Sequence, residues 1–250
     1  MKDSYGQWQS KAYLKQYYST DHIAEDELHI FQFILKFLKR ENQKFDKILD
    51  VGCGPTIHHV LPFVPLVDEV YLADYLKENL DEIDKWLKNK KDAHDWSTYI
   101  KEELDIEGKD AIETPQQRTD LLREKIVSLL RCDVFQKKVI PIDIKFSLVT
   151  SFFCVDCATS SKKEWYNGVR NISELIEPSG WIILSALRNT DKYFVNGKQF
   201  PSANVSEDDV KSALEESGFH ISTIEVEVRP VPMWEAEGFN SIVIACAQRK

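Results

Sequence analysis

The sequence K-I-L-D-V-G-C-G-P-T spans residues 47–56 and is the strongest indication of fold class in the chain. A short apolar run reaches Asp50 and then breaks at two glycines, which favours a buried strand followed by a loop. Gly52 and Gly54 lack a Cβ and can adopt positive φ, so a ligand can lie directly against the backbone. The dinucleotide pattern G-x-G-x-x-G would need a third glycine where Ile57 stands. The loop therefore favours an adenosyl ligand other than NAD, with an ordinary tight turn as the alternative.

A second apolar run covers residues 67–73 and ends at Asp74, about 20 residues after Gly54. In doubly wound domains, an acidic residue at the end of the second strand holds the hydroxyls of a ribose. One carboxylate can accept hydrogen bonds from both the 2′- and the 3′-hydroxyl. The glycine loop and the spaced acid together predict a Rossmann-like α/β sheet that binds a nucleoside.

Several motifs extend this interpretation over nearly the whole chain. They are Y-L-K-Q-Y-Y at 13–18, D-V-G-C-G-P-T-I at 50–57, A-D-Y-x-x-x-N-L at 73–80, R-C-D-V at 131–134 and E-G-F-N-S-I-V-I-A-C-A-Q-R at 237–249. In this order and spacing, the sequence resembles the nicotinamide, phenylethanolamine and indolethylamine N-methyltransferase family.

The resemblance implies a class I methyltransferase fold in one domain, residues 1–250. Such a fold has a seven-stranded, mostly parallel sheet with an antiparallel last strand. A helical N-terminal lid over 1–45 and a helical insertion over 90–131 complete it. The implied cofactor is S-adenosyl-L-methionine, which leaves as S-adenosyl-L-homocysteine.

The resemblance also implies which residues contact the cofactor. Aromatic lid residues suit a sulfonium, because ring faces attract cations, and an acid at position 133 can accept a hydrogen bond from the adenine amino group. His58 stands where relatives often carry a tyrosine. The expected cofactor contacts are Tyr13, Tyr18, Gly52, Gly54, Thr56, His58, Asp74, Tyr75, Asn79, Asp133, Val134 and Phe152.

For the methyl acceptor, the resemblance implies contacts with Tyr17, Phe153, Ser185, Tyr193 and Ser202. An aliphatic amine must lose a proton before it attacks, and Asp156 matches an acidic position of amine-methylating relatives, so it is the expected catalytic residue. Glu235, Glu237 and Asp191 are weaker candidates that are more simply surface carboxylates. Ser185 stands where nicotinamide-methylating relatives carry an aspartate, which argues against nicotinamide as the acceptor.

Composition narrows the functional class. The net charge of −9 disfavours binding to nucleic acid. Five cysteines with irregular spacing are typical of reduced thiols, and Cys154 and Cys157 have no second pair of ligands nearby to complete a zinc site. No apolar run approaches the roughly 20 residues that span a bilayer, and the first residues lack an apolar signal segment. We expect a cytoplasmic monomer with no bound metal, membrane or nucleic acid.

The expected reaction is direct displacement at the sulfonium methyl by the nitrogen of a small amine or heteroaromatic acceptor. Three alternatives stay open at this point. The acceptor atom could be the sulfur or selenium of a small thioether, which needs no base. The chain could be a catalytically silent member that binds the cofactor, or, least favoured, an NAD-dependent oxidoreductase.

Hydrophobic periodicity, together with capping and turn residues, predicts the helices and strands. A helix over 21–41 would be capped by Thr20 or Asp21, and Asn196-Gly197 would turn a hairpin over 190–202. Other helices are expected over 75–89, 162–176 and 206–217, and strands over 46–51, 68–74, 146–153, 181–187, 221–228 and 241–247.

Overall fold

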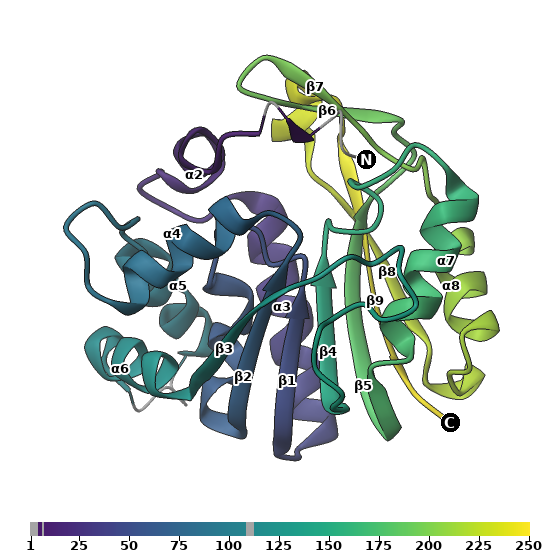
Figure 1. Ribbon diagram of the computed structural model, residues 1–250, viewed down its shortest axis with the longest axis horizontal. Helices are drawn as coiled ribbons and strands as arrows, with labels where there is room; N and C mark the ends of the chain where they lie inside the picture. Colours follow the sequence, from purple (N-terminus) through teal and green to yellow (C-terminus); the bar gives the residue numbers. More distant parts are fainter. Residues whose placement is uncertain (1–4, 7, 109–112) are drawn as a thin grey trace.

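A computed structural model describes residues 5–6, 8–108 and 113–250, and its centre is a seven-stranded sheet with the order β3-β2-β1-β4-β5-β9-β8 (Figure 1). Strand β9 pairs antiparallel with both β5 and β8, whereas the other pairs are parallel. The strands are β1 Phe45–Val51, β2 Val67–Asp74, β3 Ile126–Arg131, β4 Phe146–Phe152, β5 Ile176–Leu187, β8 Glu225–Pro230 and β9 Ser241–Gln248. This is the expected class I methyltransferase sheet.

Helices cover both faces of the sheet and bury it. Alternate strand residues separate into two apolar cores, one reached by Ile48 and the other by Leu49. The first core includes side chains of α3 Glu25–Glu41, η1 His58–Leu66, α4 Lys77–Leu87, α5 Ser97–Glu107 and α6 Pro115–Lys125. The second includes those of α7 Lys162–Ser173 and α8 Glu207–Glu216. Because both faces are buried, the central strands are continuous apolar runs and do not alternate with polar residues.

Strand order also fixes where a ligand can bind. From β1 the chain proceeds outward through β2 to β3, and then returns to β4 on the other side of β1. Ligands of open α/β sheets bind at such a reversal, outside the carboxyl ends of the strands. The loop of residues 52–57 leaves β1 at this point.

Three smaller segments lie over the same edge of the sheet. They are helix α2 Ser10–Tyr18, the two-stranded hairpin β6 Lys192–Val195 with β7 Lys198–Pro201, and the short helix η4 Pro232–Glu237 (Figure 1). Asn196 and Gly197 turn the hairpin with φ of 49° and 70°, so the expected Asn-Gly turn is confirmed.

Several expected boundaries were wrong. Helix α3 begins at Glu25 and not at residue 21. Its N-cap is Ala24, whose methyl side chain cannot accept a hydrogen bond, and the hydroxyl of Thr20, an expected cap, donates to the carbonyl of His22. Residues 221–223 form the short helix η3 Ile221–Thr223, and the strand expected there begins only at Glu225.

The segment expected as a helical insertion, 90–131, contains two helices and one strand of the sheet. Helices α5 and α6 occupy its middle, but Ile126–Arg131 pairs parallel with β2, with Leu72 opposite Leu129. Ile126 and Val127 are β-branched and suit a strand, and pairing with β2 holds this stretch extended at the edge of the sheet.

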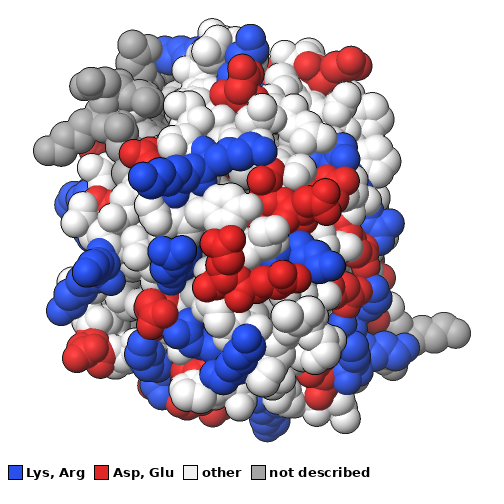
Figure 2. Space-filling model, turned by 90° about the vertical axis from the view of Figure 1, so that its right-hand side faces the viewer, with Lys and Arg blue, Asp and Glu red and all other residues white. Residues whose placement is uncertain are grey.

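The surface carries both charge signs. On the side of the molecule that shows α7 and α8, lysine and arginine side chains are interspersed with aspartate and glutamate and do not form a single basic band (Figure 2). Within the described ranges, every helix is too short or too polar to cross a membrane.

Candidate active site

A cavity of about 140 Å³ opens at the carboxyl ends of β1, β2 and β4, under the N-terminal segment. It collects most of the residues expected to bind the cofactor or the acceptor. Those that line it are Tyr13, Tyr17, Tyr18, Gly52, Gly54, Thr56, Asp74, Tyr75, Asn79, Asp133, Val134, Phe152, Phe153 and Tyr193.

The glycine loop adopts the conformation that its sequence predicts. Gly52 and Gly54 have φ of 73° and 61°, a region that residues with a Cβ rarely occupy. A Cβ on Gly52 would lie 2.1 Å from the Sγ of Cys154, so this position has no room for a side chain. The amides of Gly52 and Cys53 donate to the carbonyl of Ala73 at 2.7 and 3.0 Å, which ties the loop to the end of β2.

Asp74 is held in place by three donors. Its carboxylate accepts hydrogen bonds from the amide of Gly54 at 2.9 Å, the amide of Leu76 at 2.7 Å and the side-chain amide of Asn79 at 2.9 Å. Burial raises the pKa of this carboxyl group, and these donors oppose the shift. The carboxylate is thus positioned before any ligand arrives, as a site for two hydroxyl groups requires.

Asn79 connects the cofactor end of the cavity to the N-terminal segment. Its Oδ1 accepts hydrogen bonds from the indole of Trp8 at 2.9 Å and from the hydroxyl of Ser10 at 2.7 Å. The same side chain donates to Asp74. Closure of the segment over the cavity is therefore linked to the orientation of the acid at the end of β2.

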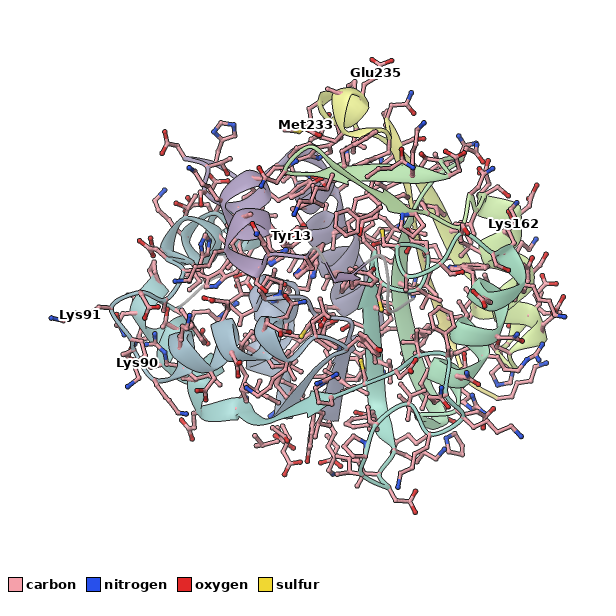
Figure 3. The ribbon with its side chains drawn as sticks, turned by 45° about the horizontal axis from the view of Figure 1, so that its top comes forward. Tyr13, Lys90, Lys91, Lys162, Met233 and Glu235 are labelled. Carbon is pink, nitrogen blue, oxygen red and sulfur yellow. The ribbon has the colours of Figure 1, made fainter. Side chains whose placement is uncertain are left out.

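Three tyrosines of α2 form a wall of the cavity. The hydroxyls of Tyr13 and Tyr18 are 3.2 Å apart, and that of Tyr18 donates to Glu27 at 3.1 Å. The hydroxyl of Tyr17 donates to the carbonyl of Phe194 in β6 at 2.8 Å, which joins α2 to the hairpin. Figure 3 shows Tyr13, which belongs to α2, near the middle of the molecule. Burial raises the pKa of all three hydroxyls, so they stay neutral.

Asp133 and Val134 line the opposite end of the cavity, beyond β3. The Asp133 carboxylate accepts a hydrogen bond from the amide of Phe135 at 3.0 Å, and Asn171 donates to the carbonyl of Val134 at 2.9 Å. The side chain of Arg131 lies over the ring of Tyr75, 5.7 Å from its centroid. The loop after β3 is therefore fixed next to the site where the resemblance places adenine.

His58, an expected cofactor contact, does not line the cavity in this structure. Its ring is fully buried and stacks on Trp96 at 5.3 Å between centroids, while its Nε2 lies 3.0 Å from Glu27. The next residue, His59, lines the cavity instead; its ring stacks on Phe152 at 4.3 Å and its Nε2 is 2.9 Å from Glu27. Consecutive side chains in the tight turn of η1 point in different directions, so a shift of one residue decides which ring is accessible.

Asp156, for which the resemblance implied a catalytic role, also lies outside the cavity in this structure. One carboxylate oxygen accepts a hydrogen bond from the amide of Leu187 at 2.8 Å, and the other is buried without a partner. Phe153 has a φ of 48°, and this left-handed residue turns the chain after β4 so that Asp156 lies beneath the cavity floor. The carboxylate holds the loop after β4 to the end of β5.

Two expected acceptor contacts are likewise absent from the cavity. Ser185 and Asp156 border a separate space of about 10 Å³ behind the sheet, too small for a substrate. Ser202 is fully buried beyond the hairpin, and its amide donates to the carbonyl of Asp191. The weaker acid candidates do not line the cavity either: Asp191 and Glu235 are exposed, and Figure 3 shows Glu235 at the outer edge of η4. Glu237 is partly buried on the same short helix.

Several lining residues were not predicted from sequence. Asp26 and Glu27 reach the cavity from the first turn of α3, and Phe239 reaches it from the loop before β9. The three consecutive acids at 25–27, at the start of an amphipathic helix, were a visible signal, but acids are common there because they complement the helix dipole. The others are Tyr5, Trp8, Cys53, His59, Leu76, Cys132, Cys154, Cys157, Ala158 and Leu187.

Glu27, His58 and His59 bring one donor atom each within 4.8 Å of one another, a grouping that could hold a metal ion. The Glu27 carboxylate already accepts hydrogen bonds from Tyr18 and pairs with His59, and these imidazoles keep its pKa below its usual range against the effect of burial. Hydrogen bonding therefore accounts for the position of Glu27. Cys154 and Cys157, weighed above as metal ligands, are free thiols.

With this geometry in place, comparison with known proteins is informative. The model of the NNMT/PNMT/TEMT family matches residues 1–248. The chain belongs to this family. It is an S-adenosylmethionine-dependent methyltransferase, as the motifs at 50–57 and 73–80 led us to expect.

Named relatives within the family are similar over most of the chain. Human nicotinamide N-methyltransferase is 29% identical over 233 residues, which cover 90% of this chain and 87% of that protein. Rabbit indolethylamine N-methyltransferase is 26% identical, with 85% and 82% covered. Human phenylethanolamine N-methyltransferase is 25% identical, with 81% and 73% covered.

Solved structures share the fold at low sequence identity. The magnesium protoporphyrin IX methyltransferase of Synechocystis, solved with bound S-adenosylmethionine, has a TM-score of 0.56 at 12% identity and covers 99% of this chain and 94% of its own. A methyltransferase of Methanosarcina mazei has a TM-score of 0.57 at 11% identity, with 85% and 96% covered. At such identities the likeness shows the class I fold.

Proposed function

We propose that this family member transfers the methyl group of S-adenosylmethionine to the nitrogen of a small amine or heteroaromatic acceptor. The observation that carries the proposal is a single cavity that combines a cofactor end with an acceptor end. The glycine loop, Asp74 and Asp133 form the cofactor end. Tyr17, Phe239 and Asp26 line the acceptor end. The three relatives described above are all N-methyltransferases, which supports the same class.

The residues of the cofactor end have distinct roles in this proposal. Asp74 accepts hydrogen bonds from the ribose hydroxyls, and the Asp133–Val134 segment contacts the adenine. Gly52 and Gly54 let the methionine part of the cofactor approach the backbone. The rings of Tyr13 and Tyr18 lie near the glycine loop, and Tyr13 comes within 4.0 Å of the place that a Cβ on Gly54 would occupy. Their faces suit a sulfonium.

The reaction needs positioning more than covalent chemistry. The acceptor nitrogen attacks the methyl carbon in line with the breaking carbon–sulfur bond; a nitrogen–carbon bond forms, and sulfur keeps the electron pair as a neutral thioether. The aromatic lid excludes water from this step.

Nicotinamide is disfavoured as the acceptor. Nicotinamide-methylating relatives carry an aspartate at the position of Ser185, and Ser185 lies outside the cavity. We expect the protein to act as a cytoplasmic monomer.

A methyl-transfer screen tests the proposal. The purified protein would be incubated with S-adenosylmethionine and with panels of primary amines, pyridines and thioethers, and products would be identified by mass spectrometry. Methylation of nitrogen in one panel is the expected result. Methylation of thioethers alone would move the assignment to a sulfur methyltransferase, and cofactor binding without any product would favour a silent member.

A further inference from the structure

Asp26 is a buried carboxylate that faces the cavity without a cation to balance it. It lies in the first turn of α3, is 6% exposed and lines the cavity. Its Oδ1 accepts a hydrogen bond from the indole of Trp234 at 2.8 Å. No ion pair joins it to a lysine, arginine or histidine in the described part of the chain. Buried charges in proteins are normally paired, so this arrangement points to a cation that arrives with a ligand.

Glu27, the acid next to Asp26, differs from it in having partners within the protein. Glu27 follows Asp26 directly and is equally buried, but its carboxylate pairs with His59 and accepts a hydrogen bond from Tyr18. Burial, and next the charge of Glu27, raise the pKa of Asp26 to about 7. The two adjacent carboxylates therefore differ: one is neutralised within the protein, whereas the other keeps the capacity to bind a positive group.

Aromatic rings pack against the indole that holds Asp26. Tyr17 packs on Trp234 with 4.9 Å between ring centroids, and Phe239 stacks on Trp234 at 6.2 Å. Tyr13 packs on Tyr17 at 5.1 Å. A carboxylate among ring faces is the environment that proteins use for ammonium groups, because the rings attract the cation and exclude water.

We propose that Asp26, with Tyr17 and Phe239, binds the ammonium group of the methyl acceptor, so that the substrate is an aliphatic amine and not a neutral heteroaromatic. This inference rests on the function proposed above and names its substrate class. The ammonium gives a proton to the Asp26 carboxylate, and the neutral amine then attacks the sulfonium methyl. The product is an N-methylammonium ion and S-adenosylhomocysteine, and the protonated Asp26 releases its proton to solvent.

A different cation could also bind there, since the cofactor carries an α-ammonium group and a sulfonium. The two cases separate experimentally. If Asp26 binds the acceptor, Asp26→Asn weakens acceptor binding and leaves the affinities for S-adenosylmethionine and S-adenosylhomocysteine unchanged. If Asp26 binds the α-ammonium group of the cofactor, the same variant weakens the binding of both, and if it binds the sulfonium, the variant weakens the binding of S-adenosylmethionine alone; either result would show that the proposal is wrong.

The test measures binding by calorimetry to protein already saturated with S-adenosylhomocysteine, at pH 8, where Asp26 is ionised. The probes are 2-phenylethylamine, tryptamine and n-butylamine, each compared with the alcohol of the same carbon skeleton. The proteins are the wild type, Asp26→Asn and the matched control Glu25→Gln, which removes a carboxylate of the same turn that does not line the cavity.

We expect at least one amine to bind the wild type and Glu25→Gln about 100-fold more tightly than its alcohol, a preference that Asp26→Asn loses. Equal binding of amines and alcohols to the wild type, an unchanged preference in Asp26→Asn, or no binding by any amine would overturn the proposal. The binding readout does not require turnover. Loss of the preference in Asp26→Asn, together with a failed methyl-transfer screen, would thus support Asp26 as an ammonium site while contradicting the proposed function.

Discussion

Among single residues, Asp74 is the one on which the proposed cofactor binding depends most. Three donors already orient its carboxylate, and the proposed ribose hydroxyls would add two further charge-assisted hydrogen bonds. Hydrogen bonds to a charged group contribute about 1.5–3 kcal/mol each. We therefore predict that Asp74→Asn weakens S-adenosylhomocysteine binding by about 100-fold or more, as measured by calorimetry.

The matched control is Asp84→Asn, which changes a partly exposed carboxylate of α4 that pairs with Lys88. It should leave the affinity for S-adenosylhomocysteine within about twofold. Melting temperatures recorded in parallel show whether either variant is unfolded. An unchanged dissociation constant in a folded Asp74→Asn protein would refute the ribose assignment.

The pKa of Asp26 gives acceptor binding a pH dependence of defined sign. Burial raises this pKa from 3.8 to about 7, so the carboxyl group is neutral at pH 5.5 and ionised at pH 8. Because n-butylamine stays protonated over this window, its affinity should rise by about tenfold from pH 5.5 to pH 8 in the wild type. Calorimetric titrations at the two values measure it.

Other titratable groups face Asp26, and the variant separates their effects. Glu27 on the same helix is held ionised by its histidines, and Tyr13, Tyr17, Tyr18 and Tyr99 have raised pKa values and stay neutral. Burial lowers the pKa of His59 but the charge of Glu27 outweighs it, so this pKa is raised, and any effect of the His59 charge is common to the wild type and the variant. The rise in affinity should therefore shrink in Asp26→Asn; an identical rise would assign the pH dependence to His59 instead.

At this scale, the sequence predicted residues whose positions depend on one strand and one turn. Gly52, Gly54 and Asp74 follow directly from strand ends, and all three line the cavity. His58 and Asp156 were misplaced because their direction depends on the turn of η1 and on the left-handed φ of Phe153. Neither feature has a local sequence signature, since a phenylalanine rarely adopts positive φ.

Among the elements, the glycine loop depends most on residue identity. A side chain at Gly52 would meet the Sγ of Cys154 at 2.1 Å and would require a left-handed backbone. We predict that Gly52→Ala lowers the free energy of unfolding by about 3 kcal/mol or more, from steric overlap added to backbone strain. Urea denaturation followed by circular dichroism measures the change.

Gly197 provides the control for this prediction. It has a similar φ of 70° in the hairpin turn, but nothing lies within 4 Å of a Cβ built on it. Gly197→Ala should cost only about 1 kcal/mol, the contribution of strain alone. Equal effects of the two substitutions would show that the contact with Cys154 does not constrain the loop.

Element boundaries were predicted well where local signals and tertiary packing agree. Helix α8 begins after Ser206, which forms a capping box with Asp209, and the Asn-Gly turn fixed the hairpin. Strand β3 was missed because the sequence of 126–131 follows a helix without a turn signal, and only pairing with β2 makes it extended. The β-branched pair Ile126-Val127 was the one local signal for this strand.

For the whole molecule, the order of the strands places the cavity where the chain reverses direction across the sheet, and the motif spacing was sufficient to predict this. The acceptor end was not predictable, since it combines α2, α3, the hairpin and the loop between η4 and β9, segments far apart in sequence. Side chains from four segments meet there only once the chain has folded.

The grouping of Glu27, His58 and His59 gives a prediction about the complete enzyme. Direct displacement at a sulfonium needs no metal, and Glu27 is already satisfied by His59 and Tyr18. Dialysis against EDTA should therefore leave the rate of methyl transfer unchanged within about 20%. A loss of activity that zinc, manganese or iron restores would show that this cluster binds a catalytic or structural metal.

The most direct test of the central claim is a calorimetric titration of the protein with S-adenosylhomocysteine. Because the glycine loop, Asp74 and Asp133 form one preorganised cofactor site, we predict one molecule bound per chain with a dissociation constant in the micromolar range. The absence of any binding heat at millimolar ligand, with the protein folded, would contradict this assignment.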